Sequence, residues 1–216
     1  MNKDLYGDIK INFHASIRIK KNNLILYFDP YKITNEISLN DADYVFITHR
    51  HYDHFSKEDI KKVMKYKTKF IAPLDMREEL INFGVLESNM ILVEPGTTYK
   101  LDDISFDTIA SYNINKDYHK KEYNWVGYNV LLDNKKYYIV GDSDVIPEMN
   151  NVYADVLFVP VGGTYTMDYK EAADLTNELK PKYAIPIHYG EVGSVNDANK
   201  FTESINDNIN GIIIGG

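Results

Sequence analysis

Six consecutive residues carry a concentration of metal-binding side chains: His49, Arg50, His51, Tyr52, Asp53 and His54. Three of the chain's six histidines fall in this stretch, with a carboxylate between them. Imidazole and carboxylate groups are the ligands that divalent transition metals such as Zn²⁺ take in proteins. A single histidine in a loop is usually a solvated polar residue, but this density of ligands predicts a metal site. The four side chains can serve two ions, and further ligands must then come from elsewhere in the chain.

A strand, a loop and a helix are expected to position this cluster. The apolar run Tyr44–Thr48 directly before it predicts a buried strand. After it, Ser56 can cap a helix near 57–66, with Asp59 three residues further on, close to the capping-box pattern. The cluster is therefore predicted to lie on the loop between the strand and the helix.

Two distant residues repeat the same placement at the end of a strand. Asp142 follows a predicted strand at 136–140, and His188 ends one at 183–187. Ligands at the ends of separate strands can gather in one pocket at the edge of a sheet. Taken alone, Asp142 lies in a segment of turn composition and His188 is an ordinary polar residue. Together with the cluster, both are better explained as metal ligands.

Three other polar residues are weaker candidates. His119 lies in a polar loop, 113–125, that follows a predicted strand. His14 and Asp29 each end a strand near the N-terminus, where their side chains could face the same rim of a sheet. Asp29 precedes a proline, so it is equally well explained as a strand terminator.

The composition excludes several classes of site and partner. A chain of 216 residues without cysteine cannot form disulfides, zinc–thiolate sites, Cys-ligated iron–sulfur clusters or a Cys nucleophile. The net charge of −8 argues against a nucleic-acid partner, and the lysine clusters at 61–62, 65–67 and 120–121 are typical of solvated faces. The chain has no long apolar run, and its first eight residues lack the apolar core of a signal peptide. We therefore expect a cytoplasmic protein without a membrane partner.

The order of predicted elements is that of a layered α/β protein. The first half contains an antiparallel meander, the buried strand and helix around the cluster, and a further strand and helix, the last ending at Gly84. Strands are predicted at 9–13, 17–19, 24–28, 44–48, 69–72, 90–93, 97–101, 104–110, 126–132, 136–140, 155–159, 183–187 and 211–214, and helices near 57–66, 75–83, 168–180 and 196–207. Pro186 predicts that its strand is an edge or irregular one. No linker interrupts the pattern, so residues 1–216 are predicted to form a single domain.

The cluster His49-Arg50-His51-Tyr52-Asp53-His54 resembles the HxHxDH signature of the metallo-β-lactamase superfamily. Asp142 and His188 resemble that superfamily's bridging aspartate and last histidine, and the match runs along nearly the whole chain. More narrowly, the chain is similar to the small metal-dependent hydrolases grouped with ascorbate-6-phosphate lactonase and N-acyl-phosphatidylethanolamine phospholipase D. The narrower likeness rests on Phe13-His14-Ala15-Ser16, Asp29-Pro30, Ala42-Asp43, Gly141-Asp142-Ser143-Asp144 and the segment 160–167.

The resemblance implies an αββα four-layer sandwich, in which two mixed β-sheets lie face to face with helices outside. It also implies two divalent metal ions. The ligands would be His49, His51 and a third histidine for the first ion, Asp53, His54 and His188 for the second, and Asp142 as the bridge. His119 is the natural candidate for the third histidine. Zn²⁺ suits these ligands, and so do Mn²⁺, Fe²⁺ and Ni²⁺.

The function that the resemblance implies is a metal-dependent hydrolase, in which a metal-bridging hydroxide cleaves a small ester, lactone or phosphodiester. Asp53 would act as a ligand that also orients the hydroxide, and Asp142 would set the spacing of the ions. His14 would stabilise charge on the substrate or support a ligand. Tyr165, in a Gly-Gly loop, would contact substrate or pack. The histidine at position 51 argues against the diiron oxygen-reducing relatives, which carry glutamate there.

Two other functions remain open. Some members of the superfamily are nucleases, but the acidic charge of this chain argues against a nuclease or phosphodiesterase acting on nucleic acid. A non-catalytic metal-binding protein is the second alternative, and the intact ligand set argues against it. The expected partner is thus a small-molecule substrate, while the oligomeric state is left open.

Overall fold

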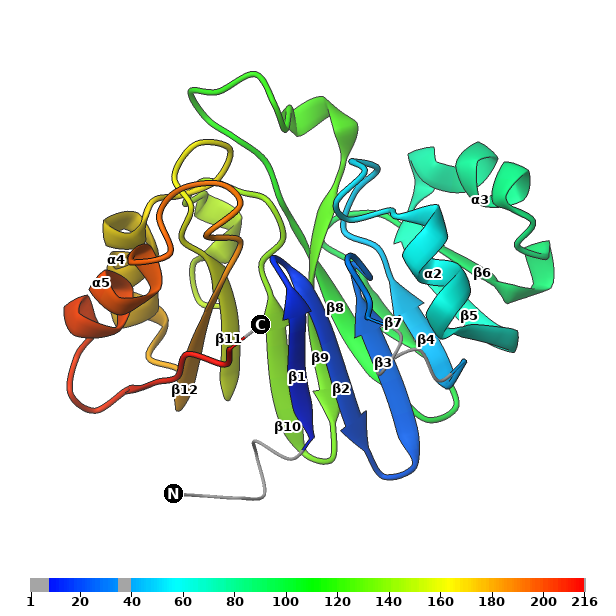
Figure 1. Ribbon diagram of the computed structural model, residues 1–216, viewed down its shortest axis with the longest axis horizontal. Helices are drawn as coiled ribbons and strands as arrows, with labels where there is room; N and C mark the ends of the chain where they lie inside the picture. Colours follow the sequence, from blue (N-terminus) through cyan, green and yellow to red (C-terminus); the bar gives the residue numbers. More distant parts are fainter. Residues whose placement is uncertain (1–7, 35–39, 216) are drawn as a thin grey trace. The chain divides into compact units, whose positions relative to one another are not determined.

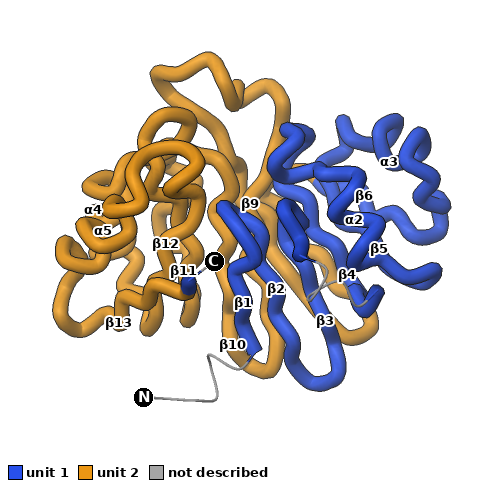
Figure 2. Tube along the Cα trace, in the orientation of Figure 1, with its two compact units in different colours: residues 1–93, 215–216 blue, residues 94–214 orange. Residues whose placement is uncertain are grey.

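The computed structural model describes residues 8–34 and 40–215, and its strands form two mixed β-sheets accompanied by helices (Figure 1). The chain divides into two compact units, residues 1–93 with 215–216 and residues 94–214 (Figure 2). The predicted α/β class with two mixed sheets is confirmed, whereas the single domain over 1–216 stays a prediction. The segment 1–7, where no signal peptide is expected, lies outside the described residues. Within the described ranges, no helix combines the length and hydrophobicity needed to cross a bilayer.

The first unit contains a six-stranded sheet in the order β1-β2-β3-β4-β5-β6. Its strands are β1 Ile9–Phe13, β2 Ser16–Lys21, β3 Leu24–Phe28, β4 Ala42–Phe46, β5 Met64–Pro73 and β6 Met90–Val93. The first three pair antiparallel and the rest pair parallel. Helices α2 Lys57–Val63 and α3 Arg77–Phe83 connect the parallel strands. Apolar side chains of both helices pack with those of β3, β4 and β5 in one buried cluster.

The second unit contains a seven-stranded sheet in the order β13-β12-β11-β10-β9-β8-β7. Its strands are β7 Thr98–Lys100, β8 Ser105–Ala110, β9 Val126–Leu132, β10 Lys135–Ile139, β11 Val156–Pro160, β12 Tyr183–Ile187 and β13 Asn210–Gly211. Strands β7 to β10 pair antiparallel, and β10 to β13 pair parallel. Helices α4 Tyr169–Leu179 and α5 Asp197–Ser204 pack beside β11 and β12. Single 3₁₀ turns lie at η1 Leu74–Met76, η2 Glu87–Asn89, η3 Lys121–Tyr123 and η4 Pro147–Met149.

Local capping signals were good predictors of helix ends. Ser56 accepts a hydrogen bond from the backbone N–H of Asp59 and caps α2, and Gly84 ends α3 with a left-handed backbone, φ 97°. Asp168 and Glu171 form the capping box of α4. Each of these residues has the side chain or backbone freedom that its position requires.

Several predicted elements differ from the structure. The last strand, predicted at 211–214, is only Asn210–Gly211, and the last helix, predicted at 196–207, is Asp197–Ser204. The helix after the cluster ends at Val63 instead of 66, because Met64 is already extended and opens β5. Thr68 fixes this early start, since its hydroxyl donates to the carbonyl of Ala42 in β4 at 2.6 Å. The edge position predicted from Pro186 is wrong, because β13 lies outside β12. However, β13 pairs only with Tyr183 and Ala184, so its short ladder needs no donor at Pro186.

Asp59 ties the start of α2 to the segment that follows β3. Its carboxylate accepts hydrogen bonds from the backbone N–H groups of Lys32 (2.8 Å) and Ile33 (3.0 Å). Ser56 Oγ (2.7 Å) and Lys62 Nζ (2.8 Å) donate to it as well. Burial alone would raise the pKa of this carboxyl, but the hydrogen bonds outweigh burial and hold the pKa below its ordinary value.

We expect Asp59→Asn to lower the free energy of unfolding by about 2 kcal/mol at neutral pH, because a charged acceptor becomes neutral. The folded pKa lies below the unfolded value of about 3.9. The stabilisation is therefore present above that value and is lost as the pH falls through the folded pKa. Urea unfolding of both proteins across this range measures the difference, which should narrow in acid. If the difference in free energy of unfolding between the two proteins stays constant with pH, the charge of Asp59 is not what stabilises the fold.

Candidate metal centre

The histidine cluster occupies a tight loop between β4 and α2. The carbonyl of His51 accepts hydrogen bonds from the N–H groups of His54 (3.0 Å) and Phe55 (2.8 Å), which closes a turn on the chain. Phe55 is buried in the apolar cluster of the first unit and anchors the end of the loop. The loop is thus fixed by its own backbone and by one aromatic side chain.

His14, Asp53 and His54 converge in the first unit. Asp53 Oδ2 lies 3.4 Å from His14 Nε2 and 3.5 Å from His54 Nε2. The ligand atoms that these three residues offer lie within 4.8 Å of one another. Both imidazoles are buried, and the Asp53 side chain is 17% exposed. One carboxylate and two imidazoles in this arrangement can bind a divalent cation.

A second convergence in the same unit joins His49 and His51. His49 Nε2 lies 3.1 Å from His51 Nδ1, and the His49 ring centroid lies 4.0 Å from that of His54. Two ring nitrogens this close can share a proton or a cation between them. The loop therefore presents two neighbouring sets of ligand atoms.

Asp29 fixes the orientation of His54. Asp29 Oδ2 lies 2.7 Å from His54 Nδ1, and the carboxylate also accepts hydrogen bonds from Thr48 Oγ1 (2.7 Å) and the Thr48 N–H (2.8 Å). With its proton on Nδ1, His54 keeps a lone pair on Nε2, the atom that faces Asp53. His49 Nδ1 is held in a similar way by Thr48 Oγ1 at 2.9 Å.

The second unit brings together the three distant candidates. Asp142 Oδ2 lies 3.0 Å from His188 Nε2 and 3.4 Å from His119 Nε2. All three side chains are buried, with Asp142 only 4% exposed. His119, six residues into its loop, therefore reaches the same carboxylate as His188, which directly follows β12.

Asn113 positions His119 within that loop. Its Oδ1 lies 2.9 Å from His119 Nδ1 and 3.1 Å from the His119 N–H, and the Asn113 N–H donates to the His119 carbonyl at 2.7 Å. The loop is tied to the ligand-bearing turn after β10, because Ser111 Oγ donates to the carbonyl of Asp142 at 3.0 Å. The histidine thus keeps Nε2 for Asp142 while Nδ1 is engaged.

Three of the candidate residues have a left-handed backbone, which is uncommon outside glycine. The φ values are 56° at His14, 44° at Asp29 and 56° at His188. Each of the three is the first residue after a strand. Such backbone strain is retained where it aims a side chain at a functional site.

The donor set fits divalent transition metals. It consists of imidazoles and carboxylates without thiolate, and the Nδ1 atoms of His54 and His119 are held by oxygen atoms of Asp29 and Asn113. The sequence locates Asp29 at the end of a strand but assigns it no role, and it does not identify Thr48 or Asn113 as supporting residues. Only their positions could have indicated this role, since Thr48 directly precedes His49 and Asn113 lies in the polar loop of His119.

Tyr165 contacts other residues of the protein through both its backbone and its ring. Its carbonyl accepts a hydrogen bond from Asn113 Nδ2 at 2.8 Å, and its ring lies edge-on to Tyr118 with centroids 4.5 Å apart. The alternative in which Tyr165 packs is thus supported, while a contact with substrate stays a prediction.

Comparison with known proteins identifies the family. The model of the beta-lactamase superfamily domain matches residues 8–188. A UPF0173 metal-dependent hydrolase of Nanoarchaeum equitans is 32% identical over 189 residues, which cover 84% of this chain and 83% of the relative. These matches confirm the superfamily that the HxHxDH signature indicated, while the narrower likeness to the lactonase and phospholipase group stays a prediction.

Two solved structures share the fold. A protein from Parabacteroides distasonis, 26% identical, superposes with a TM-score of 0.83 over 95% of this chain and 91% of that one. Igni18, a metallo hydrolase from Ignicoccus hospitalis, is 23% identical, with a TM-score of 0.78 over 96% and 95% of the two chains. The predicted metallo-β-lactamase fold is confirmed, and the chain belongs to the UPF0173 metal-dependent hydrolase family within the beta-lactamase superfamily.

Proposed function

We propose that the protein is a metal-dependent hydrolase that cleaves a small ester, lactone or phosphodiester at a dinuclear centre. The observation that carries the proposal is the buried Asp142 carboxylate, which has the Nε2 atoms of His119 and His188 at 3.4 and 3.0 Å. A buried carboxylate beside two buried imidazoles is arranged for a cation.

The proposed ligand sets follow the superfamily pattern, residue by residue. His49, His51 and His119 would hold one ion, Asp53, His54 and His188 the other, and Asp142 both. Two such ions, when bound, would supply hydroxide near neutral pH and polarise the carbonyl or phosphoryl oxygen of the substrate. Because this chemistry needs no Ser or Cys nucleophile, the absence of cysteine is consistent with it.

The remaining polar residues would orient these ligands and the substrate. Asp29 holds Nδ1 of His54, and Asn113 holds Nδ1 of His119, so both imidazoles present Nε2. His14 is proposed to stabilise negative charge that develops on the substrate, since its Nε2 lies 3.4 Å from Asp53 and the ring is buried.

The ion pairs of the lysine side chains favour a small-molecule substrate over nucleic acid. Members of the three lysine clusters are engaged in ion pairs, Lys62 with Asp59, Lys65 with Asp43 and Lys121 with Glu148. Lysines that are neutralised in this way do not form the basic track that phosphate binding requires.

A hydrolase screen tests the proposal. Lactones, phosphodiesters, phosphomonoesters and thioesters are offered to metal-free protein reloaded with Zn²⁺ or Mn²⁺, and turnover of one of these classes is expected only after reloading. Binding to RNA and single-stranded DNA is measured in parallel. Tight binding that weakens steeply with salt, together with cleavage, would replace the proposal by a nuclease. Turnover that is unaffected by metal removal would refute it.

We expect the metal-replete protein to carry about two ions per chain and the His119→Ala variant about one, because one ion loses a protein ligand. Elemental analysis after gel filtration in metal-free buffer measures both values. Asp117→Ala, an exposed carboxylate in the same loop, is the matched control and should keep the wild-type content. Equal metal content in His119→Ala and wild type would remove His119 from the ligand set.

A further inference from the structure

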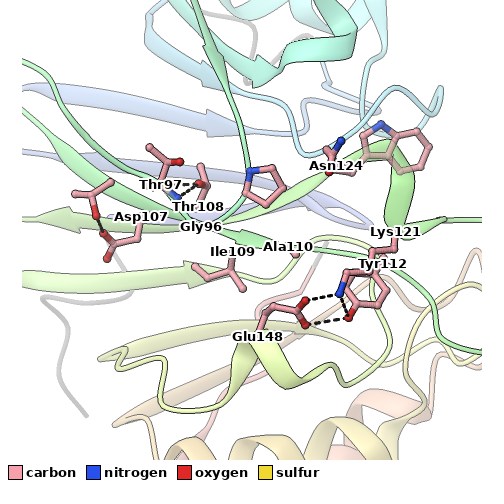
Figure 3. Close-up of a pocket in the computed structure, with 13 residues that line it drawn as sticks. Gly96, Thr97, Asp107, Thr108, Ile109, Ala110, Tyr112, Lys121, Asn124 and Glu148 are labelled. Atoms are coloured by element: carbon pink, nitrogen blue, oxygen red, sulfur yellow. Dashed lines mark hydrogen bonds and ion pairs between the residues drawn. The ribbon is translucent and has the colours of Figure 1, made fainter.

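A cavity of about 550 Å³ lies in the second unit beside β7 and β8, at one end of its sheet (Figure 3). Its walls come from the turn before β7, from β8 and the residues after it, and from η3 and η4. None of its lining residues belongs to the ligand set proposed above. The cavity has the size of sites that bind drug-sized molecules, about 300–1,000 Å³.

The apolar part of the cavity wall is aromatic and aliphatic. Tyr112 and Trp125 contribute rings that are 8% and 4% exposed, and Pro95, Ile109 and Ala110 contribute aliphatic surface. Ring edges beside flat aliphatic surface favour a ligand with a planar apolar face, because edge-on aromatic contacts add to the free energy of burial.

The polar part of the wall is a bonded group of three side chains, which Figure 3 shows at one end of the cavity. Lys121 Nζ donates to Glu148 Oε1 at 2.7 Å and to the Tyr112 hydroxyl at 3.1 Å. The Tyr112 hydroxyl donates to Glu148 Oε2 at 2.9 Å. The hydrogen bond with Glu148 raises the pKa of Lys121, and the same bond lowers the pKa of Glu148, so both stay charged at neutral pH.

These charges select for a neutral ligand. An anion would meet the carboxylates of Glu148 and Asp107, and a cation would meet the ammonium group of Lys121. Asp107 is itself bonded to Thr98 Oγ1 at 2.7 Å and paired with Lys136. A neutral molecule with adjacent donor and acceptor groups can bond to the third ammonium proton and to a carboxylate lone pair at the same time.

The wall of this cavity also contacts one of the proposed metal ligands. The Trp125 ring lies edge-on to the His119 ring, with centroids 5.7 Å apart. The backbone N–H of Tyr112 donates a hydrogen bond to Ser143 Oγ at 3.1 Å, and Ser143 directly follows Asp142 in the chain. Trp125 is the chain's single tryptophan, so tryptophan fluorescence of this protein comes only from a residue in the cavity wall.

We propose that this cavity is a second small-molecule site, which binds a neutral, planar heteroaromatic molecule carrying adjacent hydrogen-bond donor and acceptor groups. The ring would pack against Pro95, Ile109 and Ala110 and the accessible edges of Tyr112 and Trp125, and the donor–acceptor edge would bond to Lys121 and Glu148. The site is separate from the proposed hydrolytic centre and does not depend on a bound metal.

Three probes of one shape test the proposal: quinoline-6-carboxamide, which is neutral, quinoline-6-carboxylate, an anion, and 6-(aminomethyl)quinoline, a cation. Titration calorimetry with the metal-free protein is expected to give a Kd below about 1 mM for the amide and values at least about tenfold weaker for both charged probes. The Trp125 emission should shift with the amide. Equal binding of the three probes, or no binding of the amide, would overturn the proposal.

Variants locate the bound probe. Ala110→Phe fills the cavity and should weaken the amide at least about tenfold, whereas Leu131→Phe, an exposed position on β9, should not. If circular dichroism shows Ala110→Phe to be unfolded, the two single variants Lys121→Met and Glu148→Leu replace it. Each is expected to weaken binding of the amide about fivefold. The Asp142→Ala variant should bind the amide with the wild-type Kd, which would show that this site is distinct from the hydrolytic centre. Unchanged binding in the cavity variants would overturn the assignment.

Discussion

Replacing Asp142 by alanine is expected to lower kcat/KM by about 10³-fold or more, a loss of about 4 kcal/mol in transition-state stabilisation. The reason is that the Asp142 carboxylate lies within 3.4 Å of His119 Nε2 and 3.0 Å of His188 Nε2. In the proposed centre it binds both ions, so its loss removes a ligand from each. Metal content should fall together with activity, from about two ions to one or fewer.

The backbone around Asp142 should survive this change. Its carbonyl still accepts the hydrogen bond from Ser111, and Ser143 still bonds to the backbone of Tyr112. Activity on the substrate found in the screen and elemental analysis are measured on the same preparation. Asp174→Ala, an exposed carboxylate on α4, is the control and should match wild type. An Asp142→Ala protein with full metal and activity would refute the bridging role.

The positions of the proposed ligands could be predicted because these residues follow strands. Strand periodicity and capping residues located β4, β10 and β12 to within a few residues, and Asp142 and His188 follow the ends of two of them. The ends of parallel strands β10, β11 and β12 fall on one edge of the sheet, which brings Asp142 and His188 together. Local sequence therefore contains most of the information needed to find these residues.

Partners far apart in the sequence could not be predicted in this way. Asp29 and His54 are 25 residues apart, and nothing in Asp29-Pro30 distinguishes a ligand-orienting carboxylate from a strand terminator. The strands predicted at 90–93 and 97–101 are a second example. They are close in the sequence, yet β6 and β7 belong to different sheets. Both cases depend on the pairing of strands, which periodicity along one segment does not specify.

Asp29 is expected to have the second largest effect after the ligands themselves. Its carboxylate bonds to His54 Nδ1, to Thr48 Oγ1 and to the Thr48 N–H, while its own backbone is left-handed at φ 44°. Removing a carboxylate that orients a metal-binding histidine typically lowers metal affinity about 10–100-fold. Alanine in a left-handed conformation adds a backbone cost of about 1 kcal/mol, which asparagine largely avoids.

The two substitutions therefore separate orientation from stability. Asp29→Asn should weaken Zn²⁺ binding about tenfold in chelator competition. Its loss in free energy of unfolding of the metal-free protein should be smaller than that of Asp29→Ala, because the amide oxygen can still accept from the Thr48 N–H. Asp29→Ala should weaken binding by a similar or larger factor and also lower the free energy of unfolding by about 2–3 kcal/mol, because the buried Thr48 N–H loses its acceptor. Asp43→Ala is the matched control, since Asp43 accepts from the Ile25 N–H at 2.8 Å but contacts no histidine in the described structure. It should lose stability and keep its Zn²⁺ affinity. If Asp29→Asn binds Zn²⁺ as tightly as wild type, the carboxylate serves the backbone alone and His54 is oriented by other contacts.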